Sequence, residues 1–496
     1  MSAVSNYADA EAERQTELAE SHLSFGHQLS QAGRFVDAEA SFRRVIELCP
    51  THPMAHNNIG WTREMQGDST AALANYECAL GFDPRLRIAR RNLAKLLVRL
   101  GRRDESLPLW HAEVTADDDG LAWMQHLVSD TMRHRDLSLA GEYAAILAEL
   151  RWSSRWYPRR ASDSIAFMPR RVPVTSISLH KLRHDIEQFG YLQRLGVLGD
   201  EFTPIVADYQ RLVERLEPHG SEARMPLEDE VERAIGHVYN RIVHIRTTPR
   251  VERALSGAWD PAAMEKQYLN HPPGVVVVDD FLSRDALEGL RLFCLESTVW
   301  SANRYAHGRF GAFFHDGFNC PLLLQIAEEL REALPRIIGY RHELRQLWGF
   351  KNGYTLPPAV TTHADFAAVN VNFWITPTDA NLDENSGGLI MYGVDAPLSW
   401  DFNTYNGRTD IIEPFLERQQ ARSVTIPYRQ NRAVIFNSDL FHGTDGVQFR
   451  PGYENRRVNV TMLYGDREQD SQRITQDAVS SSFSSWRSAS FSRARR

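Results

Sequence analysis

Two patterns of apolar and polar residues divide the chain. In the first half, apolar residues recur every three or four positions, as on one face of an amphipathic helix. The stretch SLHKLRHDIEQF is an example, and Ser178 at its start is a suitable N-terminal cap. From Gly274 on, short runs such as VNVNFWIT alternate between apolar and polar residues, and turn residues separate them. The pattern predicts a helical N-terminal part and a strand-rich C-terminal part.

The helical part contains a repeat with a period of 34 residues. Small residues, prolines and aromatic residues recur at this spacing: Gly26 and Gly60; Gly33, Gly67 and Gly101; Ala38 and Ala72; Pro50 and Pro84; and Phe42, Tyr76 and Trp110. Small residues let two helices approach closely, and a glycine at the turn ends the first helix without a steric penalty. Each unit is therefore predicted to be a pair of antiparallel helices.

These positions resemble the tetratricopeptide repeat, with three units over residues 19–120 and a further helix over 121–150 that caps the stack. The resemblance implies an all-α solenoid. Solenoids of this kind usually offer a concave surface to a peptide or protein. A scaffold that only supports folding or dimerisation is the alternative.

The C-terminal part reads as strands separated by Gly, Pro, Asn and Asp. A buried-strand run, GVVVVDDFL, precedes two predicted helices, SRDALEGLRLFCLES and residues 321–334. Strand-like runs follow: RQLWGF, VNVNFWIT, GGLIMY, RSVTIPY, RAVIFN and RRVNVTMLYG. Many short strands with turns between them favour a sandwich or barrel.

The chain is thus predicted to be multidomain. The expected parts are a polar tail (1–18), repeats with a capping helix (19–150), a helical connector (151–262), a strand-rich domain with flanking helices (263–468) and a disordered Ser/Arg-rich tail (469–496). Within the connector we expect helices over 204–217 and 228–245.

Composition and charge narrow the classes of function. The net charge of −8 gives no basic field for a nucleic acid. Four cysteines without a CxxC pattern argue against a disulfide framework or a thiolate zinc site. The start has no basic and apolar leader, and no run approaches the length of a membrane span. We therefore expect a cytoplasmic protein without nucleic-acid or membrane partners, and the sequence leaves the oligomeric state open.

One alternating segment follows a histidine and an aspartate that lie two residues apart. On a strand, His363 and Asp365 point to the same face and can reach one ion together. The spacing alone is weak, because His111 and Glu113 show it inside a repeat helix. His442, after the run RAVIFN, offers a third ligand. Two histidines and one carboxylate with open positions form the ligand set of non-haem Fe(II) oxygenases, and zinc accepts the same ligands.

A later run supplies a candidate anion-binding residue. In RRVNVTMLYG, Arg457, Asn459 and Thr461 share one strand face. An arginine that points into a barrel is unfavourable unless it meets an anion, and a guanidinium suits a carboxylate. A dicarboxylate such as 2-oxoglutarate could ligate iron at one end and pair with Arg457 at the other, and Thr461 could add a hydroxyl.

With these pieces in order, residues 274–467 resemble the Fe(II)/2-oxoglutarate-dependent dioxygenases of the prolyl 4-hydroxylase-like type. The matching motifs are VVVVDDFLS, HAD, SGGLIMY, FNSDLFH and NRRVNVTMLYG. The resemblance implies a double-stranded β-helix (jelly-roll) fold. It maps His363, Asp365 and His442 onto the iron ligands and Arg457 onto the residue that binds the distal carboxylate of 2-oxoglutarate. We prefer Arg457 to the adjacent Arg456, because the family pattern places a hydroxyl residue four positions after the arginine.

Further candidates surround this set. Tyr354 and Asn372 are weaker candidates for contact with the co-substrate. The polar and aromatic face of VNVNFWIT suits a lined pocket, and an outer surface that faces solvent is the alternative. The insertion over 394–422 is either a lid or substrate loop or an ordinary surface loop. Candidates for contact with substrate are Trp374 on the strand face and Trp400, Tyr405 and Arg408 in the insertion.

Three functions remain in view. The first is a dioxygenase that uses Fe(II), O₂ and 2-oxoglutarate to hydroxylate an unactivated C–H bond of a peptide or protein side chain bound with help of the repeats. The second is the same chemistry on a free amino acid or a small biosynthetic intermediate. The third is a non-catalytic interaction protein built on the repeats. For the enzyme, no catalytic residue is predicted beyond the metal ligands.

Overall fold

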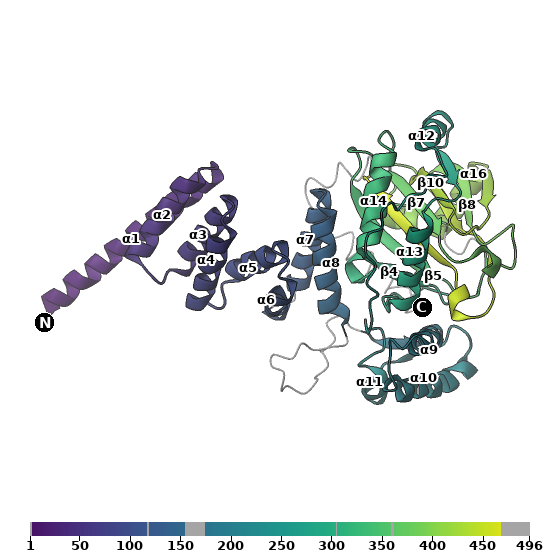
Figure 1. The fold of residues 1–496 in the computed structure, drawn as a ribbon, viewed down its shortest axis with the longest axis horizontal. Helices are drawn as coiled ribbons and strands as arrows, with labels where there is room; N and C mark the ends of the chain where they lie inside the picture. Colours follow the sequence, from purple (N-terminus) through teal and green to yellow (C-terminus); the bar gives the residue numbers. More distant parts are fainter. Residues whose placement is uncertain (1, 117–118, 154–173, 304, 359–361, 468–496) are drawn as a thin grey trace. The chain divides into compact units, whose positions relative to one another are not determined.

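The computed structural model describes residues 2–116, 119–153, 174–303, 305–358 and 362–467 (Figure 1). The chain forms two compact units, Met1–Trp123 and Met124–Arg496. The predicted disordered tail over 469–496 lies outside the described residues.

The first unit is a series of helices joined by short turns. Its helices are α1 (Ser2–Gln31), α2 (Phe35–Leu48), α3 (Pro53–Met65), α4 (Ser69–Phe82), α5 (Arg87–Arg99) and α6 (Arg103–Ala116). Each helix packs against the next one along the chain. Helix α1 begins at Ser2, so the stretch expected to be a polar tail is helical.

Residues at the 34-residue spacing hold the helix pairs together. The turn glycines share a positive φ, of 73°, 84° and 72° at Gly33, Gly67 and Gly101. The aromatic residues Phe42, Tyr76 and Trp110 are buried. A Cβ atom added to Gly60 would lie 2.8 Å from the ring of Tyr76, so α3 and α4 approach too closely for a side chain there. The repeat pattern therefore reflects both turn geometry and helix contact.

Replacing Gly60 by Val should destabilise the first unit by about 1–3 kcal/mol, because the new methyl groups would overlap Tyr76. Gly81 in α4 is the matched control, since a Cβ there meets no atom within 4 Å. Gly81→Ala should stabilise the unit by about 0.5 kcal/mol through helix propensity. Urea unfolding of the full chain, followed by circular dichroism, checks both, and equal effects of the two changes would contradict the packing argument.

The second unit begins inside helix α7 (Asp119–Arg133) and includes helix α8 (Leu137–Trp152). Here the structure differs from the expected boundary at residue 150. The side chains of Arg151 and Trp152 both donate to Asp316 Oδ1 at 2.7 Å. A Cβ atom on Gly141 would lie 2.7 Å from Leu324. Helix α8 therefore packs as part of the second unit and not as a cap on the repeats.

A truncation experiment separates these two boundaries. Removing residues 1–118 should leave the stability of the second unit unchanged. Removing residues 1–150 should lower it by several kcal/mol, because buried side chains of α8 such as Tyr143, Ile146 and Leu147 contribute about 1.5–3 kcal/mol each. Urea unfolding followed by tryptophan fluorescence measures the difference, and equal midpoints would place the boundary at 150 after all.

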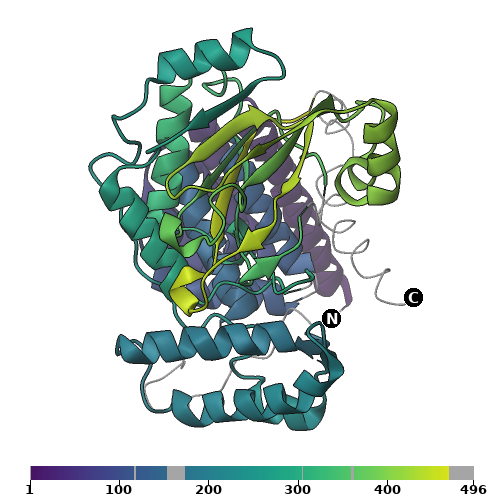
Figure 2. The ribbon, with the colours of Figure 1, turned by 90° about the vertical axis from the view of Figure 1, so that its right-hand side faces the viewer.

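The connector region contains less helix than the sequence predicted. It contains β1 (Ser176–Ser178), α9 (Leu179–Arg194), α10 (Phe202–Leu216), β2 (Arg224–Pro226) and α11 (Asp229–Ile235). Ser178 caps α9 by accepting a hydrogen bond from the Lys181 amide at 3.2 Å. Strands β1 and β2 pair antiparallel, and α9 and α10 lie side by side (Figure 2). The helix expected over 228–245 ends at Ile235.

Two antiparallel sheets form the C-terminal part, which is strand-rich as predicted. The larger has the order β3 (Val275–Val278), β10 (Ala433–Asn437), β7 (Val369–Trp374), β13 (Val458–Tyr464), β5 (Leu344–Lys351) and β4 (Phe310–Phe313). The smaller has the order β11 (Leu440–Thr444), β8 (Leu389–Asp395) and β9 (Ser423–Ile426). A short pair, β6 (Thr355–Leu356) and β12 (Val447–Gln448), accompanies them.

The larger sheet is covered on both faces. One apolar cluster joins Trp374, Val434 and Phe436 of the larger sheet to Leu389 and Met391 of the smaller one. Helices α12 (Pro261–Asn270), α13 (Arg284–Glu296) and α14 (Pro321–Ala333) complete this part (Figure 1). On the other face, the Tyr464 hydroxyl donates to the Ala327 carbonyl of α14 at 3.1 Å. No helix in the described ranges combines the length and apolar character needed to cross a membrane.

Four short 3₁₀ turns and two helices complete the elements. The turns are η1 (Glu217–His219), η2 (Phe314–Asp316), η3 (Thr378–Ala380) and η4 (Tyr453–Asn455). The insertion over 394–422 folds into α15 (Phe402–Gly407) and α16 (Thr409–Arg418). The insertion therefore has its own regular structure.

Candidate metal centre

Backbone pairing brings the three candidate metal ligands together. His363 and His442 exchange two backbone hydrogen bonds, of 2.9 Å and 2.8 Å. The Asp365 amide donates to the Ser438 carbonyl at 3.1 Å. As a result, one potential ligand atom from each of His363, Asp365 and His442 lies within 4.8 Å of the others. No second group of three His, Cys, Asp or Glu residues with this geometry occurs among the described residues.

The histidines present suitable ring nitrogens to the carboxylate. His442 Nδ1 lies 3.0 Å from the Leu440 carbonyl, which favours a proton on Nδ1 and leaves Nε2 as a lone-pair donor. His442 Nε2 is 3.5 Å from Asp365 Oδ2, and His363 Nε2 is 3.7 Å from Asp365 Oδ1. The β8–β11 register shifts between Leu440 and His442, and such an irregularity can re-aim a side chain.

The environment of Asp365 keeps its carboxylate ionised. Burial raises its pKa, but the nearby imidazoles and a hydrogen bond from Asn370 outweigh burial and lower it. Asn370 Nδ2 donates to Asp365 Oδ2 at 2.6 Å, which also fixes the carboxylate plane. Metal ligation requires a deprotonated carboxylate. The donor set therefore fits a divalent metal ion such as Fe(II) or Zn(II).

Arg457 is a buried cation bonded to neutral groups. Its side chain is 1% exposed, and Nε donates to the Gly387 carbonyl at 2.6 Å. The other two nitrogens donate to the Gly388 carbonyl at 3.3 Å and to Asn459 Oδ1 at 3.1 Å. Burial lowers the Arg457 pKa to about 10. Among the described residues no carboxylate forms an ion pair with Arg457, so an anionic ligand would offset its desolvation.

Gly387 and Gly388, beside Arg457, are required by a positive φ at the first and by a close backbone approach at the second. Gly387 has a φ of 79°, and a Cβ atom on Gly388 would lie 1.8 Å from the Ile426 carbonyl oxygen. A side chain at Gly388 would therefore move the two carbonyls away from Arg457. This explains the glycines of the SGGLIMY motif.

The adjacent Arg456 has different partners. Its Nε lies 2.7 Å from Glu187 Oε2, and its guanidinium lies 4.6 Å from the ring centre of Tyr354. The Tyr354 hydroxyl also donates to Glu187, at 2.8 Å. Of the two arginines, Arg457 is therefore the one without a carboxylate partner among described residues. The contacts of Tyr354 are with Glu187 and Arg456, which gives its expected role at the co-substrate no direct support.

The face of β7 that carries Asn370, Asn372 and Trp374 is buried, so it is not an outer surface. Asn372 Nδ2 donates to Thr461 Oγ1 at 3.0 Å, and the Trp374 ring centre lies 5.7 Å from the Arg457 guanidinium carbon. Asn372 Oδ1 and Trp374 Nε1 are buried without a hydrogen-bond partner in the described part of the chain. Buried polar atoms are usually paired, so these two favour a polar ligand at this face.

The insertion supports the ligand-bearing backbone. The Ala364 amide donates to the Tyr405 carbonyl at 3.0 Å, and Asn406 Nδ2 donates to the Ala364 carbonyl at 2.8 Å. The Tyr405 side chain is buried beside Ala364, and Trp400 packs against Phe415 and Phe441. Both aromatic residues therefore belong to an apolar cluster behind the ligands.

Arg408 lies at the surface. Its guanidinium pairs with Asp410 at 2.7 Å, at the start of α16, and both side chains are about half exposed. Its expected contact with substrate has no direct support in these interactions.

Two residues near the site carried no role in the sequence-based predictions. Asn370 was visible as part of the polar strand face, but its bond to Asp365 depends on a turn that the sequence does not specify. Tyr428 is buried with its ring 5.8 Å from the Arg457 guanidinium carbon. The run RSVTIPY gave no signal that its last residue would face an arginine that follows later in the chain.

Comparisons with known proteins bear on the first unit. Residues 41–74 match the model of the tetratricopeptide repeat family. These residues are a tetratricopeptide repeat. This match confirms the repeat predicted there and does not extend to the C-terminal sheets. No curated protein matches the chain.

Several solved structures share a limited likeness. The TPR2AB domain of yeast Sti1, solved as a pHSP90 complex, is 17% identical over 29% of this chain and 54% of that chain, with a TM-score of 0.22. The chain therefore spans about half the length of that structure. MamA is 16% identical over 29% of this chain and 83% of its own, with a TM-score of 0.22. A Thermobaculum terrenum O-GlcNAc transferase mutant is 18% identical over 28% and 27%, with a TM-score of 0.23.

The bond from Asn370 to Asp365 gives a test of the metal site. Asn370→Ala should weaken Fe(II) binding by about 10–100-fold, because partners of metal ligands orient and polarise them. Asn372→Ala, two residues along the same face, should leave the Fe(II) affinity unchanged, since Asn372 bonds to Thr461. Anaerobic calorimetric titration of the full chain measures both. Equal affinities for wild type and Asn370→Ala would show that Asp365 is not oriented by this bond.

Proposed function

We propose that the chain is an Fe(II)- and 2-oxoglutarate-dependent dioxygenase that hydroxylates a C–H bond of a peptide or protein. The observation that carries this proposal is the group of His363, Asp365 and His442, with ligand atoms within 4.8 Å of one another. Two imidazoles and one carboxylate leave several coordination positions for a co-substrate and O₂. The proposal includes a double-stranded β-helix fold for the C-terminal part, which the two antiparallel sheets and their shared apolar cluster support.

In this proposal the three side chains hold the metal through His363 Nε2, His442 Nε2 and an Asp365 oxygen. With iron bound, such a centre couples the conversion of 2-oxoglutarate and O₂ to succinate and CO₂ with the insertion of one oxygen atom into a C–H bond of the substrate. The chain itself keeps Asp365 ionised and keeps the His442 ring oriented through Leu440. It contributes position and charge, as protein groups around a metal centre generally do.

The proposed co-substrate site follows the inner face of β7. Asn370 at one end contacts Asp365, and Trp374 at the other end is beside Arg457. Asn372 and its partner Thr461 lie between them. A small dicarboxylate along this face would ligate the metal with its 2-oxo acid end and pair with Arg457 at its distal carboxylate. The buried charge of Arg457 supports this orientation, since a guanidinium binds a carboxylate through two parallel hydrogen bonds.

The repeats support a peptide or protein substrate. Tetratricopeptide repeats usually act as protein-binding modules, and one repeat covers residues 41–74. We infer that the first unit recruits the substrate or a carrier of it, while the second unit performs the reaction. Trp374 is the proposed aromatic contact inside the site, and Trp400 and Tyr405 support the ligand-bearing backbone from behind.

The direct test is succinate formation from 2-oxoglutarate by the full chain, loaded with Fe(II) without oxygen and then exposed to O₂. Wild type should show slow turnover even without substrate. His363→Ala should show none, because two remaining ligands hold the metal poorly. Arg457→Ala should raise the KM for 2-oxoglutarate by about 30-fold, or about 2 kcal/mol, for the lost buried pair.

Matched controls separate these effects from general damage. His271→Ala removes an exposed histidine, and Arg450→Ala removes an exposed arginine that pairs with Asp379. Both should behave as wild type. Absence of both Fe(II) binding and succinate in the wild-type protein would overturn the enzyme proposal and leave a protein-binding function for the repeats.

A further inference from the structure

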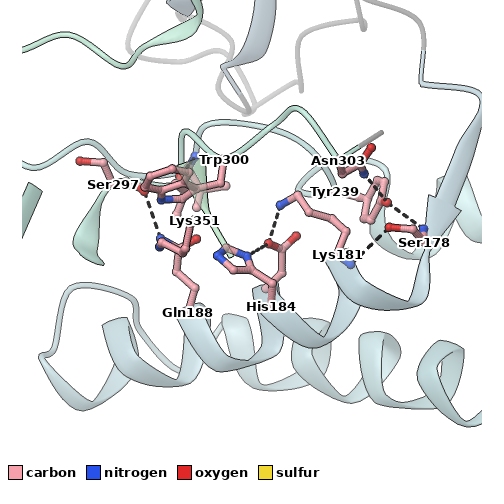
Figure 3. A network of polar contacts seen from close by, with 12 residues as sticks. Ser178, Lys181, His184, Gln188, Tyr239, Ser297, Trp300, Asn303 and Lys351 are labelled. Carbon is pink, nitrogen blue, oxygen red and sulfur yellow. Dashed lines mark hydrogen bonds and ion pairs between the residues drawn. The ribbon is translucent and has the colours of Figure 1, made fainter. Parts of the chain in front are cut away.

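Helix α9 is attached to the C-terminal sheets by a buried polar network (Figure 3). Four polar residues share its buried face: Lys181, His184, Asp185 and Gln188. Lys181 and Asp185 form an ion pair, and His184 Nδ1 lies 2.9 Å from the same carboxylate oxygen. Gln188 Nε2 donates to the carbonyls of Leu295 at 3.1 Å and Ser297 at 3.0 Å. These directional bonds fix both the position and the rotation of α9.

Lys351 of β5 meets this network from the sheet side. Its Nζ donates to the Tyr453 hydroxyl at 2.7 Å, and that hydroxyl donates to the Leu295 carbonyl at 2.7 Å. The Nζ atom lies 4.4 Å from the ring centre of Trp300 and 4.6 Å from that of Tyr453. Moving any member of a buried network of this kind is strongly destabilising, because the polar groups that lose their partners remain buried away from water. Helix α9 is therefore held firmly relative to the segment around Tyr453.

Glu187, next to Gln188, extends this attachment toward Arg457. Its Oε2 atom accepts from Arg456 Nε at 2.7 Å and from the Tyr354 hydroxyl at 2.8 Å. The Arg456 side chain is 6% exposed, so this ion pair is shielded from solvent on the arginine side. Arg456 directly precedes Arg457 in the chain.

The backbone around Asn352 links the two arginines. Arg456 Nη1 donates to the Asn352 carbonyl at 3.4 Å, and the Asn352 amide donates to the Arg457 carbonyl at 2.9 Å. On the other side, Thr376 Oγ1 donates to the Arg456 carbonyl at 2.8 Å. A displacement of the Arg456 side chain would therefore act on the backbone that carries Arg457.

We propose that Glu187 is a positioning residue for the co-substrate, acting through Arg456 to hold the guanidinium of Arg457 where it meets a carboxylate. This inference rests on the proposed function of the site. It gives the connector helix α9 a role in co-substrate affinity. Glu187 does not touch the proposed co-substrate path along β7, so its effect is indirect.

Electrostatics alone predicts the opposite sign. Removing the charge of Glu187 makes the region more positive, which would strengthen the binding of a dianion. This electrostatic gain in affinity would become smaller as salt is added. Loss of position would weaken binding at any salt concentration. Glu187→Gln removes the charge, whereas Glu187→Asp keeps the charge and shortens the side chain by one methylene. The two variants therefore separate charge from position.

The experiment is calorimetric titration of 2-oxoglutarate into the full chain loaded with Mn(II), together with KM and kcat for succinate formation by the Fe(II) protein. Both Glu187 variants should weaken 2-oxoglutarate binding and raise its KM by about tenfold, which corresponds to about 1.4 kcal/mol of binding free energy. The kcat at saturating co-substrate should stay near that of wild type. Arg456→Gln should match Glu187→Gln, and the double variant should be no weaker than either, because the two act as one unit.

The control is Glu217→Gln, which breaks an exposed ion pair between Glu217 of η1 and Arg183 of α9. Because Arg183 lies on α9 and Glu217 on η1, this change should leave the affinity unchanged. Unchanged or tighter binding in Glu187→Asp, with wild type binding 2-oxoglutarate, would overturn this inference alone. A wild-type protein that binds Mn(II) but no 2-oxoglutarate would overturn the proposed co-substrate and this inference with it. Thermal unfolding of each variant establishes that the chain stays folded.

Discussion

The two backbone hydrogen bonds between His363 and His442 determine where the candidate metal ligands lie. They join segments that are far apart in the sequence, at 2.9 Å and 2.8 Å. The arrangement of the three candidate ligands depends on this pairing. Asp365 reaches the two imidazoles because its own amide is bonded to Ser438, close to His442. Two imidazoles and a carboxylate at this distance stabilise one another only modestly, which supports the metal-binding role proposed for them.

The surrounding structure supports the pairing from several directions. The insertion holds the backbone of Ala364 through Tyr405 and Asn406. The glycine pair before β8 leaves two carbonyls for Arg457. Helix α9 holds Arg456 through Glu187. The connector helix α9 and the insertion over 394–422 thus both help to hold the residues of the site in place.

The strand-rich character of the C-terminal part followed from local pattern, and the structure brings the candidate ligands His363, Asp365 and His442 within 4.8 Å of one another. Alternation in VNVNFWIT placed Asn370, Asn372 and Trp374 on one buried face, and the 34-residue period identified a repeat that the family model confirms over 41–74. Boundaries were less accurate. Helix α8 has a helical pattern like that of the repeats, and only its contacts with Asp316 and Leu324 assign it to the second unit.

Side-chain partners were beyond the sequence, both between distant segments and between residues close in the chain. The exposed ion pair of Arg408 with Asp410 and the bonds of Tyr354 to Glu187 depend on side-chain directions that spacing does not fix. The sequence placed Asn370 on the polar face of its strand and left open whether that face is buried, and its bond to Asp365 depends on the turn between Asp365 and β7. Local periodicity determined the face of each residue, and long-range packing determined its partner.

The most direct measurement is anomalous diffraction from a crystal of the full chain grown with Mn(II) and 2-oxoglutarate without oxygen. The result expected is one strong metal peak bonded to Nε2 of His363, Nε2 of His442 and a carboxylate oxygen of Asp365. Density for the dicarboxylate should extend from that peak to the Arg457 guanidinium. A metal peak elsewhere, or ordered side chains at these three positions with no metal between them, would contradict the assignment of this centre.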